Sequence, residues 1–241
     1  MTVEKLLQKY SRLETDFGWE RDLVFTQDKY PVYSYRTQKQ GPALWAISGI
    51  HGIEKDGPNA MAIEIETIAR MANICPTIII PLCNPLGFVN GWRYTHPSED
   101  GDLDGLSVGD PNTTEGKQLS IYLLKIAQFY PPRVHLDHHH DITLDGSYVY
   151  SHDKSGLEDL VAKMIITTMK SVTAIQINGA TRWNEPIING IVGPVADGSI
   201  DDFVTKPPIS AKTSIVIETS SLAAHVAIIR AYPVIARAAR L

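Results

Sequence analysis

The sequence has few cysteines, no excess of positive charge and no apolar leader at its N-terminus. Two cysteines among 241 residues, Cys75 and Cys83, cannot make a disulfide framework, and we expect ordinary buried thiols of a cytosolic protein. The 22 Lys and Arg residues against 27 Asp and Glu give a net charge of −5. This balance argues against a nucleic-acid partner, because binding a phosphate backbone needs clustered positive charge. Segment 1–22 carries charges throughout, so we expect no signal peptide.

Long apolar runs are also missing. The longest uncharged run, Met71 to Trp92, has the length of a membrane span, but three prolines interrupt it. It predicts a buried strand followed by a loop, and therefore no membrane partner. Because 44% of the residues are hydrophobic and no linker or repeat divides the chain, we expect one cytoplasmic domain over residues 1–241. The sequence carries no signal for an oligomeric state.

Segments with strand and helix patterns alternate along the chain. Short apolar or alternating runs predict strands over 22–26, 30–35, 43–48, 77–82, 133–138, 172–177 and 214–217. Apolar residues at helical spacing, or helix-forming composition, predict helices over 3–13, 60–71, 117–129, 157–169 and from 222 nearly to the end. A long polar loop is expected over 84–114. This order predicts an α/β sandwich around a mixed or parallel sheet.

In such sheets the chemistry lies just past the carboxyl ends of the strands. His51, Asn84, His139 and Glu218 all hold such positions. His51 and Glu54 form an H-x-x-E pattern in which imidazole and carboxylate can reach one zinc ion. The pattern arises often by chance, so a surface coincidence is the alternative. Its place among glycines at the mouth of a buried strand favours a metal site.

The run His135 to Asp141 holds four histidines and two aspartates within seven residues. If it is a strand, His135, Asp137 and His139 face one way, whereas His138 and His140 face the other. A solvated polar turn is the alternative interpretation. So many ionisable groups are costly in a packed domain unless they bind something, and a metal is the simplest partner. Asp137 could then orient an imidazole from behind.

Two further residues are candidates for chemistry. Glu218 directly follows an apolar strand, where a partly buried carboxylate of raised pKa could act as a general base. A structural cap on the following helix is an equally good interpretation. Arg93 could supply a fixed charge to a developing oxyanion, or could be a solvated loop cation. The segment 105–109 fits G-x-S-x-G, but lacks the strand and helix that a nucleophilic serine needs around it.

Together these motifs resemble the zinc carboxypeptidase superfamily, which includes the succinylglutamate desuccinylase and aspartoacylase-like amidohydrolases. The family pattern is H-x-x-E, then N-P-x-G leading to an Arg, then D-x-H on a strand, then a late Glu. The chain matches it in this order at His51, Glu54, Asn84 to Gly87, Arg93, Asp137, His139 and Glu218. The resemblance spans about residues 43–221. It implies a three-layer α/β/α sandwich around a mixed, mostly parallel sheet, and a zinc-dependent, carboxypeptidase-like amide hydrolase.

The resemblance also implies a role for each matched residue. His51, Glu54 and His139 would bind one Zn²⁺ per chain, with His139 chosen because segment 136–139 fits apolar-D-x-H. Glu218 would be the general base, and Arg93 would polarise the substrate carbonyl. A non-catalytic zinc-binding module is the alternative from another class. Such a structural site would need neither Glu218 nor Arg93, and would close its fourth position with His138 or His140.

The chain departs from the digestive carboxypeptidases in its substrate-binding residues. Asn112 matches the Asn of the pair that grips a terminal carboxylate, but no Arg follows it, and no Tyr between Tyr150 and Glu218 matches the substrate-covering tyrosine. Arg182 is the candidate replacement, with a solvated surface arginine as the alternative. We therefore expect a small peptide or an acylated amino acid as substrate. An N-acyl amino acid deacylase of the desuccinylase/aspartoacylase type is the rival within the class.

Overall fold

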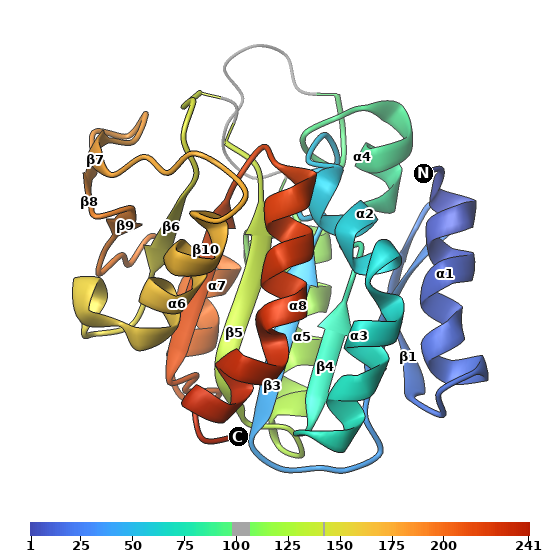
Figure 1. Ribbon diagram of the computed structural model, residues 1–241. Coiled ribbons are helices and arrows are strands. Elements are labelled where there is room, and N and C mark those ends of the chain that lie inside the picture. The colour runs from blue at the N-terminus through green and yellow to red at the C-terminus, as the bar shows by residue number, and fades with distance from the viewer. Residues whose placement is uncertain (98–106, 142) are drawn as a thin grey trace.

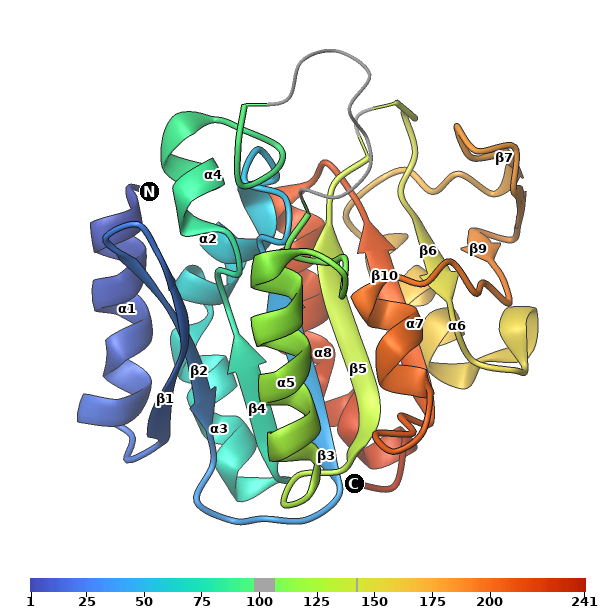
Figure 2. The same cartoon turned by 180° about the vertical axis from the view of Figure 1, so that it is seen from behind.

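The computed structural model describes residues 1–97, 107–141 and 143–241. Its strands form one mixed sheet in the order β1-β2-β4-β3-β5-β10-β6-β9-β8-β7, with helices on both faces (Figures 1 and 2). The strands are β1 Glu20–Gln27, β2 Tyr30–Arg36, β3 Ala43–Ser48, β4 Thr77–Ile80, β5 Pro132–His139, β6 Tyr148–Ser151, β7 Asn178–Ala180, β8 Pro186–Ile188, β9 Ile191–Val192 and β10 Thr213–Glu218.

The helices are α1 Val3–Thr15, α2 Asp56–Ile63, α3 Ile65–Arg70, α4 Pro85–Asn90, α5 Thr114–Ala127, α6 Leu160–Met169, α7 Ile200–Thr205 and α8 Leu222–Ala238, with 3₁₀ turns at Met71–Asn73 and Gly156–Glu158. Helices α1, α2, α3, α6 and α8 cover the face seen in Figure 1, and α5 and α7 cover the face seen in Figure 2. The predicted three-layer α/β/α architecture is confirmed. No helix among the described residues is long and apolar enough to cross a membrane.

The central strands β4, β3, β5 and β10 are mutually parallel, so their carboxyl ends meet at one edge of the sheet, the upper edge in Figure 1. In β5 and β10 the last residues, His139 and Glu218, are direct register partners. In parallel strands such partners point to the same face of the sheet. The topology therefore brings together the side chains that the sequence places at strand ends.

Two hydrophobic cores lie on opposite faces of the sheet, and β3 contributes to both. Leu44 and Ala46 pack in the core beneath α2 and α8, whereas Trp45 and Ile47 pack in the core beneath α5 and α7. This explains why β3 is a continuous apolar run rather than an alternating one. Burying each large apolar side chain contributes about 1.5–3 kcal/mol. Cys75 and Cys83 are both buried and free, as predicted.

The prediction of a strand over 172–177 is wrong. The backbone N–H groups of Val172 and Thr173 donate to the carbonyl of Met169 at 2.9 Å and so close the end of α6. Only Ile175 in that segment makes a bridge, with Ser147, before β7 begins at Asn178. The hydrogen bonds that end α6 thus outweigh the strand preference of the β-branched residues in this segment.

The prediction of a long polar loop over 84–114 is also wrong in part, because α4 lies within it. Asn84 caps this helix by accepting a hydrogen bond from the N–H of Gly87 at 2.9 Å, and Pro85 occupies the first turn. The short elements β6 and α7 were likewise not predicted from the sequence. Gly105 and Leu106, which begin the G-x-S-x-G segment, lie outside the described residues.

Candidate active site

Three predicted metal ligands meet at the carboxyl edge of the sheet. The Nδ1 atoms of His51 and His139 lie 2.8 Å and 3.0 Å from the two carboxylate oxygens of Glu54. His51 follows β3, Glu54 precedes α2, and His139 ends β5. One donor atom from each residue lies within 4.8 Å of the others. Glu54 is only 4% exposed, so the carboxylate is held inside the protein rather than on its surface.

This donor set fits zinc. Two imidazole nitrogens and one carboxylate oxygen make a common set for a catalytic zinc ion, which keeps further positions open. Donors around a tetrahedral zinc ion lie roughly 3.3 Å apart, given metal–ligand distances of about 2.0–2.1 Å. The observed separations reach that arrangement with small movements. Among the described residues no fourth imidazole, thiol or carboxylate completes the group of His51, Glu54 and His139.

The surroundings of His139 favour a positive charge. Burial lowers the pKa of His139, but Asp137 and Glu54 raise it well above its usual value. Burial also raises the pKa of Glu54, yet His51 and His139 hold it well below the usual range. The site therefore stabilises one positive charge between two carboxylates. A metal ion would compete with protons for these donor atoms, so its binding would depend on pH.

Asp137 holds the ring of His139 from the opposite side. Its Oδ2 atom lies 2.9 Å from Nε2 of His139, and the carboxylate is fully buried. A carboxylate on the far nitrogen of a ligating imidazole fixes its orientation and strengthens it as a donor. The position of Asp137 is the one that strand alternation predicts.

His138 points away from this site. Its Nδ1 lies 2.8 Å from Nδ1 of His225 and its Nε2 lies 2.7 Å from the hydroxyl of Tyr232, both on α8. All three side chains are at most 1% exposed. His140 contributes its backbone instead, donating its N–H to Glu54 at 3.1 Å. Neither histidine closes the metal position, as a purely structural site would require.

Arg93 is fixed beside the three predicted metal ligands by its loop. Its Nη1 lies 2.7 Å from Oε1 of Glu54. The N–H of Gly52 donates to the carbonyl of Arg93 at 3.0 Å. Gly52 also packs so closely on Gly87 that a Cβ atom at position 52 would lie 2.1 Å from the carbonyl carbon of Gly87. The buried Asn84 caps α4 in this loop, so its role is structural.

Glu218 shares a cavity of about 600 Å³ with His51, His139 and Arg93. Burial, together with the charge of Glu54, raises the pKa of Glu218 to about 8, against the opposing charge of His139. Glu218 does not belong to the group of three residues that could hold a metal ion, although it lies in the same cavity. A carboxyl group with such a pKa can both accept and donate a proton near neutral pH.

The other two predicted substrate-binding residues line the same cavity. Asn112 lies in the turn before α5, and Arg182 lies after β7 with its guanidinium carbon 4.6 Å from the ring centroid of Trp183. The sequence analysis missed further lining residues with polar or ionisable side chains, namely Ser107, Asp110, Tyr150, His152, Glu185, Asp197, Ser199 and Asp201. Apart from Ser107 in the G-x-S-x-G segment, they carry no motif, and most lie near short elements that pattern alone does not predict.

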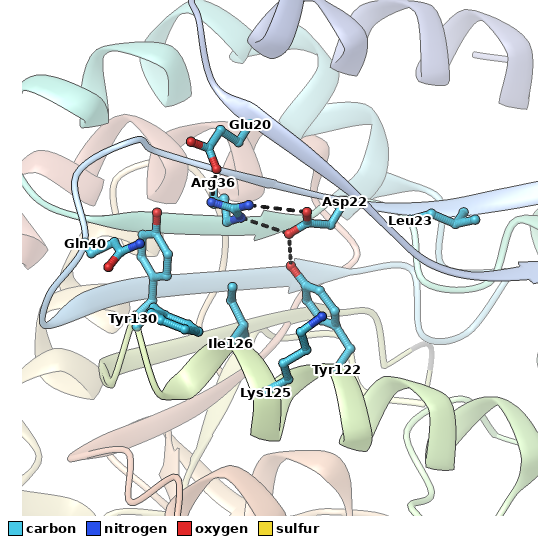
Figure 3. Close-up of a pocket in the computed structure, with 10 residues that line it drawn as sticks. Glu20, Asp22, Leu23, Arg36, Gln40, Tyr122, Lys125, Ile126 and Tyr130 are labelled. Atoms are coloured by element: carbon cyan, nitrogen blue, oxygen red, sulfur yellow. Dashed lines mark hydrogen bonds and ion pairs between the residues drawn. The ribbon is translucent and has the colours of Figure 1, made fainter.

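A second cavity, of about 420 Å³, lies between β1, β2 and α5 (Figure 3). Arg36 pairs there with Glu20 and, at 2.8 Å, with Asp22. Tyr122 donates its hydroxyl to the same carboxylate at 3.1 Å. Since these charged groups satisfy one another and none of the metal-site residues lines this cavity, we assign no function to it.

Comparison with known proteins identifies the fold. No protein-family model matches the sequence, and no curated protein matches it significantly. A protein proposed to be a metallopeptidase from Shewanella denitrificans OS217 superposes with a TM-score of 0.82 at 19% identity, over 99% of this chain and 91% of that one. Helicoverpa armigera carboxypeptidase A superposes with a TM-score of 0.69 at 15% sequence identity, over 99% of this chain and 73% of that one.

Bovine thrombin-activatable fibrinolysis inhibitor, in a structure with a tick carboxypeptidase inhibitor, gives a TM-score of 0.69 at 14% identity, over 100% of this chain and 97% of that one. The predicted resemblance to the zinc carboxypeptidase superfamily is thus confirmed at the level of the fold. Identities this low carry no information on the reaction.

Proposed function

We propose that this protein is a zinc-dependent hydrolase of amide bonds, with His51, Glu54 and His139 as the zinc ligands. One observation carries the proposal. A carboxylate with a raised pKa, Glu218, shares a cavity with three zinc-type donors but does not belong to their group. A structural zinc site has no use for such a group. The open metal position and the orientation of His138 toward α8 likewise favour catalysis over the non-catalytic alternative.

In this proposal Glu218, Arg93 and Asp137 each have a separate role in the hydrolysis. A zinc ion at this site would act as a Lewis acid that activates water and polarises a carbonyl group. Glu218 accepts the proton of the attacking water and returns it to the departing amine. Arg93 presents a positive charge to the oxygen on which negative charge develops. Asp137 keeps the ring of His139 in one orientation.

The substrate class is part of the proposal. A short peptide and an acylated amino acid would both present an amide to this cavity, which Asn112 and Arg182 line. An N-acyl amino acid deacylase is the second candidate, because no Arg follows Asn112 to grip a terminal carboxylate. We also retain a cytoplasmic location and a single domain over residues 1–241 as predictions.

The test uses zinc-loaded protein on matched panels of short peptides and N-acyl amino acids. Glu218→Gln keeps the shape of the side chain but cannot accept a proton, so turnover should fall about 10²-fold or more while zinc content stays the same. Arg93→Ala should cost about 10²–10³-fold. Glu158→Gln removes an exposed glutamate outside the cavity and serves as the control. A wild-type rate in Glu218→Gln would remove this residue as the base.

A further inference from the structure

The proposed base, Glu218, is the last residue of β10, which lies between β5 and β6 in the sheet (Figure 1). Its register partners are His139 on β5 and Tyr148 on β6. After Glu218 the chain leaves the sheet, and α8 begins at Leu222. The end of a strand opens more easily than its middle, because fewer bonds hold it. The contacts of the next residue therefore decide how firmly the carboxylate of Glu218 is placed.

Thr219 is that next residue, and it is bonded to both neighbouring strands. Its backbone N–H donates to the carbonyl of His139 at 3.2 Å, on the β5 side. Its Oγ1 accepts the hydroxyl of Ser147 at 2.6 Å, on the β6 side. The same oxygen accepts the N–H of Ser221 at 3.2 Å, and Ser221 caps α8. One residue thus ties the end of β10 to the strand that ends in His139, to the start of β6 and to the start of α8.

The bond between Ser147 and Thr219 extends the antiparallel ladder by one rung. The last pair between β10 and β6 is Glu218 with Tyr148. One step further in the same register, Thr219 lies opposite Ser147. Both backbone groups of Ser147 bond away from β10, to segment 174–176, at 2.9 Å. Side chains come close in a pair whose backbone groups do not bond each other, so here the two hydroxyls make the connection that the backbone does not.

Thr219 acts from behind the cavity. Side chains alternate along an extended chain, so Thr219 points to the opposite face from Glu218. Thr219 is 1% exposed and Ser147 is 4% exposed, and neither is among the described residues that line the cavity. A hydrogen bond shielded from water in this way holds its partners more strongly than one at the surface. Any effect of Thr219 on the reaction must pass through Glu218 or His139.

We infer that Thr219, with Ser147 as its partner, is a positioning residue that orients Glu218. The inference rests on the proposed function, in which Glu218 is the general base. A base must stay within hydrogen-bond reach of the proton that it takes, and a misplacement of about 1 Å can cost about 10²-fold in rate. Loss of the Thr219 hydroxyl should cost less, about tenfold, because the backbone bond from Thr219 to His139 remains.

The test measures kcat, KM and zinc content of zinc-loaded variants on an amide that the wild type cleaves. Thr219→Val keeps the shape of the side chain without its hydroxyl, and should lower kcat about tenfold while KM stays within about twofold. Thr219→Ser returns the hydroxyl and should bring kcat to within about threefold of the wild type. Ser147→Ala should also lower kcat. The double variant Thr219→Val/Ser147→Ala should be no slower than Thr219→Val, because both changes remove one shared bond.

Ser151→Ala is the matched control at the other end of β6. The buried hydroxyl of Ser151 donates to Asp159 at 3.2 Å, and neither residue is among those that line the cavity. This variant should lower the free energy of unfolding, as Thr219→Val should, because a buried partner is left unpaired. Its kcat should stay that of the wild type. The pair of variants therefore separates positioning of Glu218 from a general loss of stability.

Crystal structures of the zinc-loaded wild type and Thr219→Val protein add a readout that needs no substrate. The carboxylate of Glu218 should have one orientation in the wild type and be displaced in the variant. An unchanged kcat or an unmoved carboxylate in Thr219→Val would overturn the inference, as would a loss of kcat that Thr219→Ser does not restore. If the wild type cleaves no amide, the proposed hydrolysis fails, and the two crystal structures alone decide whether Thr219 orients Glu218.

Discussion

His138 and His139 are neighbours in the sequence, but they lie on opposite faces of β5 and have opposite chemistry. The nitrogens of His138 face another imidazole and a phenol on α8, and burial lowers its pKa well below the usual value. The nitrogens of His139 face two carboxylates, which raise its pKa well above the usual value despite burial. The comparison shows that strand face decides which histidine lies between carboxylates. The amino-acid composition alone cannot distinguish His138 from His139.

The largest effect should come from removing one histidine from each face. His139→Ala should lose most of the bound zinc, because one of three ligands disappears, and His51→Ala should do the same. His138→Ala should keep about one zinc per chain while losing about 1–3 kcal/mol of stability, since His225 and Tyr232 lose a buried partner. Elemental analysis after dialysis and urea unfolding measure the two quantities. The reverse outcome would show that the faces of β5 are assigned wrongly.

A smaller effect on zinc binding is expected from Asp137, which contacts His139. Asp137→Asn should weaken zinc binding by about 10–100-fold, because the orienting charge behind His139 is lost while the shape remains. Tyr232→Phe removes the corresponding contact behind His138, and should leave zinc affinity unchanged. Competition with a zinc-binding dye gives both affinities. A zinc affinity that responds equally to both substitutions would mean that the two faces are not independent.

The most gradual effect, spread over several pH units, concerns acid stability on the α8 face. Burial lowers the pKa of His225 to about 3, whereas an unfolded histidine titrates near 6.5. Between these values the unfolded state binds more protons, so the free energy of unfolding should fall as the pH falls from about 6.5 to 3. One such group contributes at most about 1.4 kcal/mol per pH unit. His225→Leu should therefore give a shallower decline in urea unfolding of the metal-free protein. An unchanged slope would contradict the assignment.

The meeting of His51, Glu54 and His139 at one edge of the sheet could be predicted from the sequence because strand ends and strand faces are local properties. His51, His139 and Glu218 each follow or end an apolar strand, and parallel pairing then brings such ends together. The alternation that separates His138 from His139 needs only a period of two. Arg93 could be found only through the resemblance, since an isolated loop arginine has no distinguishing pattern.

Asp201 and Glu185, which line the same cavity, could not be predicted in this way. Asp201 lies on α7, a helix of six residues, and Glu185 lies between two strands of three residues each. Elements this short have too few residues for a periodic pattern, and tertiary contacts fix their positions. The error over 172–177 has the same origin, because hydrogen bonds at the end of α6 overruled the local strand preference.

The contact between Gly52 and Gly87 restricts how this site could be transplanted into another protein. The loop that carries His51 and the loop that carries Arg93 touch backbone to backbone, with no side chain between them that could adjust. Neither loop can change length or shape while the other stays as it is. Segments 49–57 and 84–93 would therefore have to be transplanted into another α/β scaffold as one inseparable part.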